Sequence, residues 1–295
     1  MNKFRFSLPS FPLKLIACLL RTLDHIGRLF VSKGTGVSIP LAYYLLRAIG
    51  KCAFPVFAFF VREGVYHTSS IKNYLLRLGL CALVRDAFGY LFGLFAGLPV
   101  ADNPLIGNVF TDLFSGALLV YLLRRKDGYS FLALLPLAYE FLSGFVISSS
   151  YGTLTKSDWG AFSILHFLFR YLGRCLYDFR REKKAKERKV PFLARKESQG
   201  QLPLTLYEVI SRATCYLLFY LFYRLGLYSA SFRLLPNEFI PIGTYSLLGT
   251  LLLFLYNGKR GPDSKVIRIC FYAYYPFHLA LLGILSYFFG VLATL

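Results

Sequence analysis

Acidic residues are scarce in this sequence: 15 Asp and Glu residues stand against 34 Lys and Arg residues, and charged residues make up only 17% of the 295 positions. Hydrophobic residues make up 56%, which excludes a soluble globular protein of ordinary composition. The apolar runs do not alternate with polar residues, so the pattern also excludes a transmembrane β-barrel. We therefore predict an all-α helical bundle that crosses the cell membrane several times, because helices satisfy their own backbone hydrogen bonds in lipid.

Cysteine and histidine are also few, and neither forms a ligand pattern. The six cysteines are scattered through apolar runs without a close pair, and no spacing of His, Cys and carboxylates indicates a metal site. No phosphate-binding loop or nucleophile elbow is present. We therefore predict no metal. The net charge of +19 does not predict nucleic-acid binding, because the basic residues lie in loops, where they orient membrane helices and contact anionic lipid headgroups.

The apolar runs predict about nine transmembrane helices in a single domain that comprises residues 1–295. Basic residues concentrate in alternate loops, which places the N-terminus inside the cell. An amphipathic helix over Leu41–Ile49 precedes the second span, and residues 179–201 form a basic cytosolic linker that could extend the sixth span as a helix. The predicted spans are residues 13–31, 48–66, 72–94, 105–123, 130–148, 160–178, 204–225, 238–256 and 275–294.

A compact cationic turn lies between the last two predicted spans. Asn257 and the neighbouring glycines favour a turn, and Lys259, Arg260 and Lys265 give it fixed positive charge. One or two basic residues would suffice to orient a helix. We therefore interpret this turn as a candidate anion site at the membrane face, with a plain positive-inside anchor as the alternative.

The first predicted span carries an intramembrane polar stripe. Its members Arg21, Asp24, His25 and Arg28 stand at i, i+3, i+4 and i+7, a spacing that places them along one helical face. A carboxylate beside an imidazole suits a general base, with Asp24 orienting His25. Consecutive helical side chains point about 100° apart, so Asp24 could instead pair with Arg21 or Arg28 while His25 faces another span. A salt-bridge cluster that only holds the bundle together is the alternative.

Several short segments carry a family resemblance, and they follow one another over nearly the whole chain. The most specific block is Tyr256–Gly261 with the following Tyr275–Leu279. Together the segments resemble the TraX family of membrane proteins, named for a conjugative-plasmid protein associated with N-terminal acetylation of pilin. The other matching segments are Leu23–Gly27, Ile49-Gly50, Ala53–Phe59, Glu63-Gly64, His67-Thr68, Tyr74–Leu78, Asn108–Thr111 and Tyr151-Gly152.

The resemblance implies an integral membrane acyltransferase, similar in plan to the acyltransferase-3 group. Such an enzyme would transfer an acetyl group from acetyl-CoA to an acceptor at or beyond the membrane, where the acceptor could be a pilin-like amine, a glycan or a lipid. The implied catalytic residues are His25 as general base, Asp24 as its orienter and His278, at the inner end of the last span, as a second channel histidine. The implied donor-binding residues are Asn257, Lys259, Arg260 and Lys265.

Two other function classes fit the same composition. Charged residues within spans also mark the pathways of transporters and channels, although the two halves of this sequence show no inverted repeat. A non-enzymatic membrane partner of a conjugation or secretion apparatus would instead use the polar stripe for internal salt bridges alone. An acyltransferase requires a route from the cationic turn to His25, which neither alternative needs.

Overall fold

The structure is a computed structural model that describes residues 7–31, 41–98, 103, 105–125, 127–145, 158–187, 210, 213–214, 217 and 245–289. Within these residues the regular secondary structure is helical, and a single isolated bridge pairs Leu8 with Tyr256. The predicted all-α class is therefore confirmed for this part of the chain. The elements are α1 (Ser10–Phe30), α2 (Leu41–Lys51), α3 (Ala53–His67), α4 (Ile71–Phe95), α5 (Val109–Arg124), η1 (Gly128–Ala133), α6 (Leu134–Phe145), α7 (Ala161–Glu187), α10 (Ser246–Leu251), η3 (Leu252–Leu255) and α11 (Lys265–Phe288).

Three helical stretches are long and apolar enough to cross a membrane by themselves: Leu41–His67, Ile71–Phe95 and Lys265–Phe288. The first joins the predicted amphipathic helix to the predicted second span, because α2 and α3 follow each other almost directly. The number of nine spans and the orientation of the N-terminus stay predictions. The predicted seventh span, residues 204–225, lies almost wholly outside the described residues.

The last helix corrects one predicted boundary. The span was expected over 275–294, whereas α11 begins at Lys265. Ser264 starts it there, because its side chain accepts a hydrogen bond from the backbone N–H of Ile267 and so satisfies a free donor of the first turn. The predicted extension of the sixth span is confirmed, since α7 continues as a helix to Glu187, the last residue of the basic linker that the structure describes.

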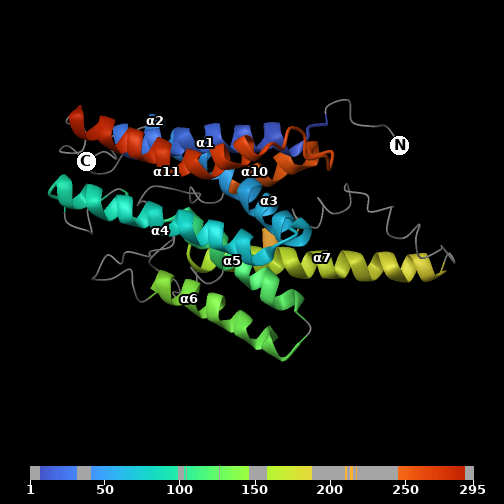
Figure 1. Cartoon of the computed structure of the whole chain (residues 1–295). Helices are drawn as coiled ribbons and strands as arrows, with labels where there is room; N and C mark the ends of the chain where they lie inside the picture. Colours follow the sequence, from blue (N-terminus) through green and yellow to red (C-terminus); the bar gives the residue numbers. More distant parts are fainter. Residues whose placement is uncertain are drawn as a thin grey trace.

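The helices form two groups that meet at α3, α4 and α5. In Figure 1, α1, α2 and α11 lie side by side along one edge, and α5, α6 and α7 lie along the other. The helix α3 runs between the groups and packs on both α1 and α5, while α4 packs on α5 and α11. Polar side chains on α1, α5 and α11 can therefore meet in the interior.

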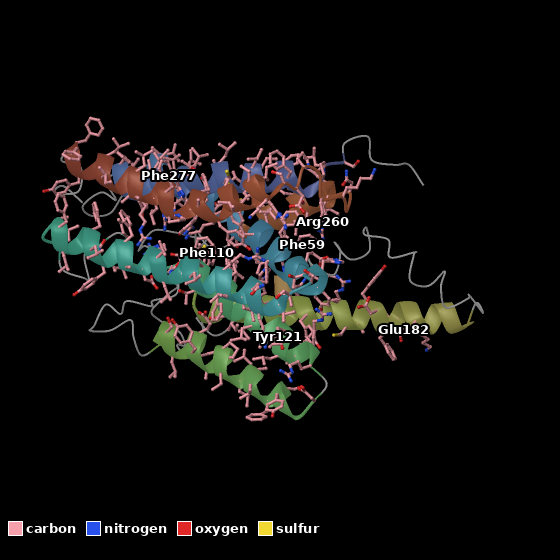
Figure 2. All side chains as sticks on the ribbon, in the orientation of Figure 1. Phe59, Phe110, Tyr121, Glu182, Arg260 and Phe277 are labelled. Atoms are coloured by element: carbon pink, nitrogen blue, oxygen red, sulfur yellow. The ribbon has the colours of Figure 1, made fainter. Side chains whose placement is uncertain are left out.

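The distribution of polarity is inverted relative to a soluble protein. Large apolar side chains such as Leu83, Leu91 and Phe277 are more than half exposed, and Phe277 projects from the outer surface of α11 (Figure 2). Charged side chains such as Arg21 and Asp24 are instead almost completely buried. An apolar exterior around ionised interior groups is what a lipid environment selects, because lipid solvates the first and not the second.

The segment before α1 is bound to the cationic turn. The backbone N–H of Leu8 donates to Leu255 (2.6 Å), and that of Ser10 donates to Lys259 (2.8 Å). The Ser10 hydroxyl donates to the carbonyl of Arg260 at 2.7 Å. Gly261 adopts φ +71°, and a Cβ there would lie 3.1 Å from that of Pro9, so a glycine fits this turn best. The start of α1 and the turn therefore occupy the same end of the bundle.

The crossing of α1 and α2 predicts a strict requirement for glycine at position 50. A Cβ on Gly50 would lie 2.6 Å from the Cα of Asp24, and neither backbone can move without disturbing the ion pairs around it. We expect Gly50→Ala to lower the free energy of unfolding by about 1–3 kcal/mol, the usual range for overpacking. Thermal unfolding of the purified protein in detergent measures this, with Gly128→Ala as the matched control, because nothing lies within 4 Å of a Cβ at Gly128. Equal melting temperatures for the two variants would contradict the close crossing.

Candidate functional site

The polar stripe predicted on the first span faces the interior of the bundle. Arg21, Asp24 and His25 on α1 are each at least 96% buried, and Arg28 is half-buried one turn further on. Their common face follows from the helical period, which brings residues three and four apart onto one side. The stripe therefore lies against α2, α11 and the segment that precedes α7.

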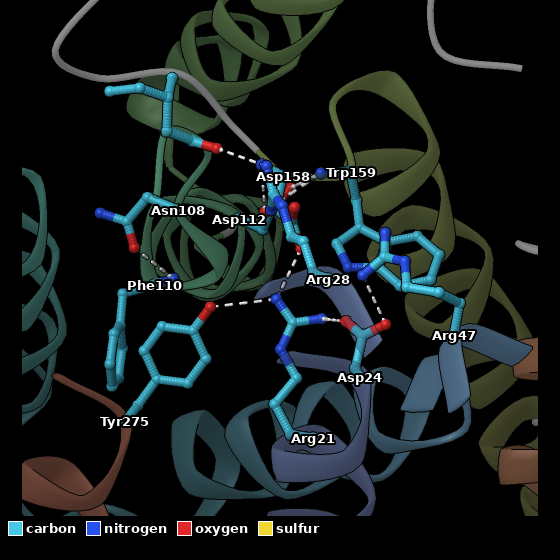
Figure 3. Close-up of polar contacts among 11 residues, drawn as sticks. Arg21, Asp24, Arg28, Arg47, Asn108, Phe110, Asp112, Asp158, Trp159 and Tyr275 are labelled. Carbon is cyan, nitrogen blue, oxygen red and sulfur yellow. Dashed lines mark hydrogen bonds and ion pairs between the residues drawn. The ribbon is translucent and has the colours of Figure 1, made fainter. Parts of the chain in front are cut away.

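Arg21 is the centre of the network that the stripe forms (Figure 3). Its guanidinium donates to Asp24 at 2.8 Å, to Asp158 at 2.7 Å and to the hydroxyl of Tyr275 at 3.0 Å. Arg47 on α2 completes the pairing by donating to the second oxygen of Asp24 at 2.6 Å. One buried arginine thus joins α1 to α11 and to the start of α7.

Asp158 lies between the predicted fifth and sixth spans. Positive side chains stabilise its carboxylate, and Asp112 binds its backbone N–H. Burial raises the pKa of its carboxyl, but the positive charges of Arg21, Lys51 and Arg28 lower it far more, so its pKa stays well below the ordinary value. The carboxylate of Asp112 on α5 accepts the backbone N–H groups of Asp158 (3.0 Å) and Trp159 (3.3 Å). This contact fixes the start of α7 against α5 and places Asp158 within reach of Arg21.

Two histidines face each other beside this network. The ring centroids of His25 on α1 and His278 on α11 are 5.2 Å apart, and both side chains are more than 90% buried. Neither ring nitrogen of His25 has a hydrogen-bond partner within the described residues, and the same holds for Nε2 of His278. Buried polar atoms are nearly always paired in native proteins, so three such nitrogens at one place indicate a position for a ligand or water.

The tautomer of His278 follows from its one hydrogen bond. Its Nδ1 lies 2.9 Å from the carbonyl oxygen of Tyr274, and a carbonyl oxygen only accepts, so Nδ1 carries the proton. In the neutral ring Nε2 then presents its lone pair. Tyr274 also stacks on the same imidazole, with 4.5 Å between the ring centroids, which fixes the ring plane.

The predicted pairing of Asp24 with His25 is wrong in this geometry. Both oxygens of Asp24 accept from arginines, one from Arg21 and one from Arg47, whereas His25 points towards α11. The physical reason is the angular step of the helix, which separates consecutive side chains by about 100°. The alternative expectation, that Asp24 pairs with an arginine of the stripe, is correct for Arg21 and not for Arg28.

The predicted donor-binding residues lie in a separate place. Asn257 organises the turn, because its Oδ1 accepts from the backbone N–H of Lys259 at 2.9 Å. The side chains of Lys259 and Arg260 are exposed, and Lys265 belongs to the first turn of α11 instead of the turn itself. Since Ser10 is bound to this turn, His25 lies about 22 Å away along α1, at 1.5 Å for each of fifteen residues.

His278 is also placed differently from the prediction, which put it at the inner end of the last span. The earlier start of α11 places His278 thirteen residues after Lys265, or about 20 Å along the helix. His278 therefore lies at the depth of His25 in the interior. The seven predicted residues form two groups, with His25, Asp24 and His278 in one and Asn257, Lys259, Arg260 and Lys265 in the other.

Three residues of the network were not singled out from the sequence: Arg47, Asp158 and Tyr275. Arg47 was assigned to an amphipathic helix, where a basic residue is ordinary, and Asp158 precedes an apolar run without any spacing that relates it to α1. Tyr275 stands in the segment that carries the family resemblance, three residues before His278. That spacing on one helix face was the available signal.

Comparisons with known proteins agree with the predicted family. The sequence model of the family described as TraX protein matches residues 11–155, which include the polar stripe and the helices from α2 to α6. A curated relative, the probable fimbrial assembly protein FimC, serogroup H1, of Dichelobacter nodosus, is 26% identical over 277 residues, which cover 92% of this chain and 93% of the relative. No solved structure matches. The resemblance to the TraX family is thus confirmed, while the relation to the acyltransferase-3 group stays a prediction.

The buried network predicts unequal effects for two aspartate variants. Asp24→Asn leaves Arg21 and Arg47 facing a neutral partner inside the bundle, and breaking such a buried pair costs about 3–5 kcal/mol of unfolding free energy. Asp127→Asn removes an ion pair with Arg125 at the surface, where solvent screens the charges, so we expect little change. Thermal unfolding of both variants in detergent provides the comparison. Similar losses in both would show that the network does not hold the helices together.

Proposed function

We propose that this chain, a membrane protein that matches the TraX family over residues 11–155, is an acyltransferase that uses acetyl-CoA to acetylate an amine or hydroxyl acceptor at or beyond the membrane. The likeness to a probable fimbrial assembly protein favours an acceptor among the components of a pilus or of its assembly apparatus. The observation that supports catalysis is the pair of buried histidines with unbonded ring nitrogens.

The histidine pair has the properties of a general base. Nε2 of His278 presents a lone pair in a buried position, and the Tyr274 carbonyl and ring hold the imidazole in one orientation. Proton transfer requires such a group within hydrogen-bond reach of the nucleophile. The prediction from the sequence gave this role to His25. We extend this role to the pair, because His25 faces the same space as His278 and its unbonded ring nitrogens could also accept a proton.

Tyr275 is placed to stabilise the charge that develops during the reaction. Its hydroxyl oxygen accepts a hydrogen bond from Arg21, so the hydroxyl proton is available for another acceptor. The ring lies 5.7 Å from that of His25 and 5.3 Å from that of His278, measured between centroids. A hydroxyl polarised by a guanidinium suits the oxyanion of a tetrahedral intermediate.

The proposed reaction follows from these positions. The acceptor nitrogen or oxygen attacks the carbonyl carbon of the acetyl thioester while His278 takes the acceptor proton at Nε2. Tyr275 donates its hydrogen bond to the carbonyl oxygen as the negative charge develops there. The carbon–sulfur bond then breaks, and the imidazolium returns the proton to the departing thiolate of coenzyme A. The acetylated acceptor and free coenzyme A are the products.

The cationic turn is the proposed site for the phosphate groups of the donor. Lys259 and Arg260 are exposed at the end of the bundle where α1 begins, and phosphates are bound best by such accessible cations. The acetyl group would then reach the histidines along α1 and α11, which both run from that end into the interior. Binding of the donor and chemistry on it are therefore assigned to residues about 20 Å apart.

Separate variants of the two groups test the proposal. In detergent-purified protein we expect saturable turnover of acetyl-CoA, measured as released thiol in the presence of a mixture of small amines and hydroxyl compounds. His278→Ala and His25→Ala should each lower kcat by about 10²–10⁴-fold, the usual contribution of a general base. The double variant Lys259→Ala/Arg260→Ala should raise the KM for acetyl-CoA about tenfold, because it removes charge-assisted contacts to phosphate.

The matched control is His67→Ala, which removes a half-exposed histidine that pairs with Glu63 at the end of α3. Its kcat should equal that of the wild type. Wild-type protein that neither binds nor consumes acetyl-CoA would refute the acyltransferase, and solute flux in liposomes would then become the relevant assay. Turnover that survives in both histidine variants would refute the assignment of the base.

A further inference from the structure

Arg85 on α4 is buried and lacks the partners that a guanidinium needs. Its side chain is 98% buried, and its Nε and Nη1 have no hydrogen-bond partner within the described residues. The nearest carboxylate, that of Asp86, lies 3.8 Å from Nη1, beyond hydrogen-bond distance. Because an unsatisfied buried charge is destabilising, an arginine kept in this state indicates an anionic partner that the described residues do not supply.

Arg28 on α1 adds a second cation at the same place. Its Nη2 donates to the backbone carbonyl of Ile106 at 3.2 Å, and it forms no ion pair within the described residues. Both guanidinium groups lie at the backbone of residues 105–106: a Cβ on Gly89 would lie 3.0 Å from Nη1 of Arg85 and 3.1 Å from the carbonyl oxygen of Leu105, the neighbour of Ile106. The carboxylate of Asp158 already accepts from Arg21, so the two arginines share no anion of their own.

Arg28 lies beyond the histidine pair when the bundle is followed from the cationic turn, and Arg85 lies at about the same depth as the pair. Arg28 is three residues further along α1 than His25. Arg85 is fourteen residues from Ile71, the start of α4, which is about 21 Å along the helix. The phosphates of a donor held at the turn would be about 20 Å from Arg85. An anion at Arg85 would therefore belong to the other reactant.

We propose that Arg85 and Arg28 form a binding site for a carboxylate or phosphate group on the acceptor. Two guanidinium groups that face one anionic group match the geometry with which arginine binds both kinds of oxyanion. Arg28 is one helical turn from His25 on α1, so an anion held there would bring the nucleophile of such an acceptor next to the histidine pair. Acceptors that carry an anionic group near the amine or hydroxyl are thus preferred over neutral ones.

The anion site itself is tested without acetyl-CoA. The full-length protein in non-ionic detergent is unfolded thermally in increasing sodium phosphate or sodium acetate, with chloride at matched ionic strength as the reference. An anion that binds only the folded state raises the melting temperature in a saturable manner. We expect saturable stabilisation of the wild type by at least one of the two anions. Among the stabilisation that depends on Arg28 and Arg85, stronger binding of phosphate assigns a phosphate-bearing acceptor, and stronger binding of acetate assigns a carboxylate-bearing one.

The variants locate the bound anion. Arg85→Gln and Arg28→Gln should each raise the concentration for half-maximal stabilisation about tenfold or more, since each loses charge-assisted hydrogen bonds. Arg125→Gln, which removes an arginine paired with Asp127 at the surface, should leave it unchanged. The same titrations in Lys259→Ala/Arg260→Ala remove any phosphate bound at the cationic turn, and the stabilisation that depends on Arg85 and Arg28 should persist there. If Arg85→Gln does not fold, Arg28→Gln gives the same answer.

Three results would overturn the site. One is a wild type that neither anion stabilises. Another is stabilisation that persists in the Arg85 and Arg28 variants, which would mean an adventitious ion only. The third is stabilisation lost only in the variant of the cationic turn. The assignment of the anion to the acceptor rests on the proposed function, whereas the binding assay does not, so the failure of one can be distinguished from the failure of the other.

Discussion

The ion pairs of Arg21 are the interaction on which the rest of this structure depends. One guanidinium is bound to Asp24 on its own helix, to Asp158 before α7 and to Tyr275 on α11. Asp158 and Tyr275 are each more than 100 residues from Arg21 in the sequence, and each of these two contacts fixes how another segment lies against α1. Ionised groups inside an apolar bundle have few alternative partners, so the pairing selects one arrangement of helices over others.

The same network explains why the histidine pair is available. Asp24 is occupied by Arg21 and Arg47, and Tyr275 accepts from Arg21, so neither neighbour satisfies the nitrogens of His25. The backbone carbonyl of Tyr274 takes only Nδ1 of His278. The polar groups of the interior therefore have two roles: the arginines and carboxylates hold the helices together, and the imidazole nitrogens are available to a ligand.

The sequence predicted the fold class, the polar face of α1 and the cationic turn before the last helix, because composition and helical period determine these features locally. It could not predict the partners of that face. Arg47 reaches Asp24, and Asp158 reaches Arg21, through the packing of α2 and the start of α7, which no spacing along the chain encodes. The expectation that Asp24 orients His25 failed for the same reason, since sequence neighbours on a helix point to different partners.

The account separates donor binding at the cationic turn from chemistry at the histidine pair, with the bundle between them. A structure of the protein with an acetyl-CoA analogue whose thioester is replaced by an unreactive thioether would test this most directly. The account predicts the phosphates at Lys259 and Arg260 and the acyl end between His25, His278 and Tyr275. An analogue bound with its acyl end away from both histidines would contradict the central claim, as would one whose phosphates contact Arg85.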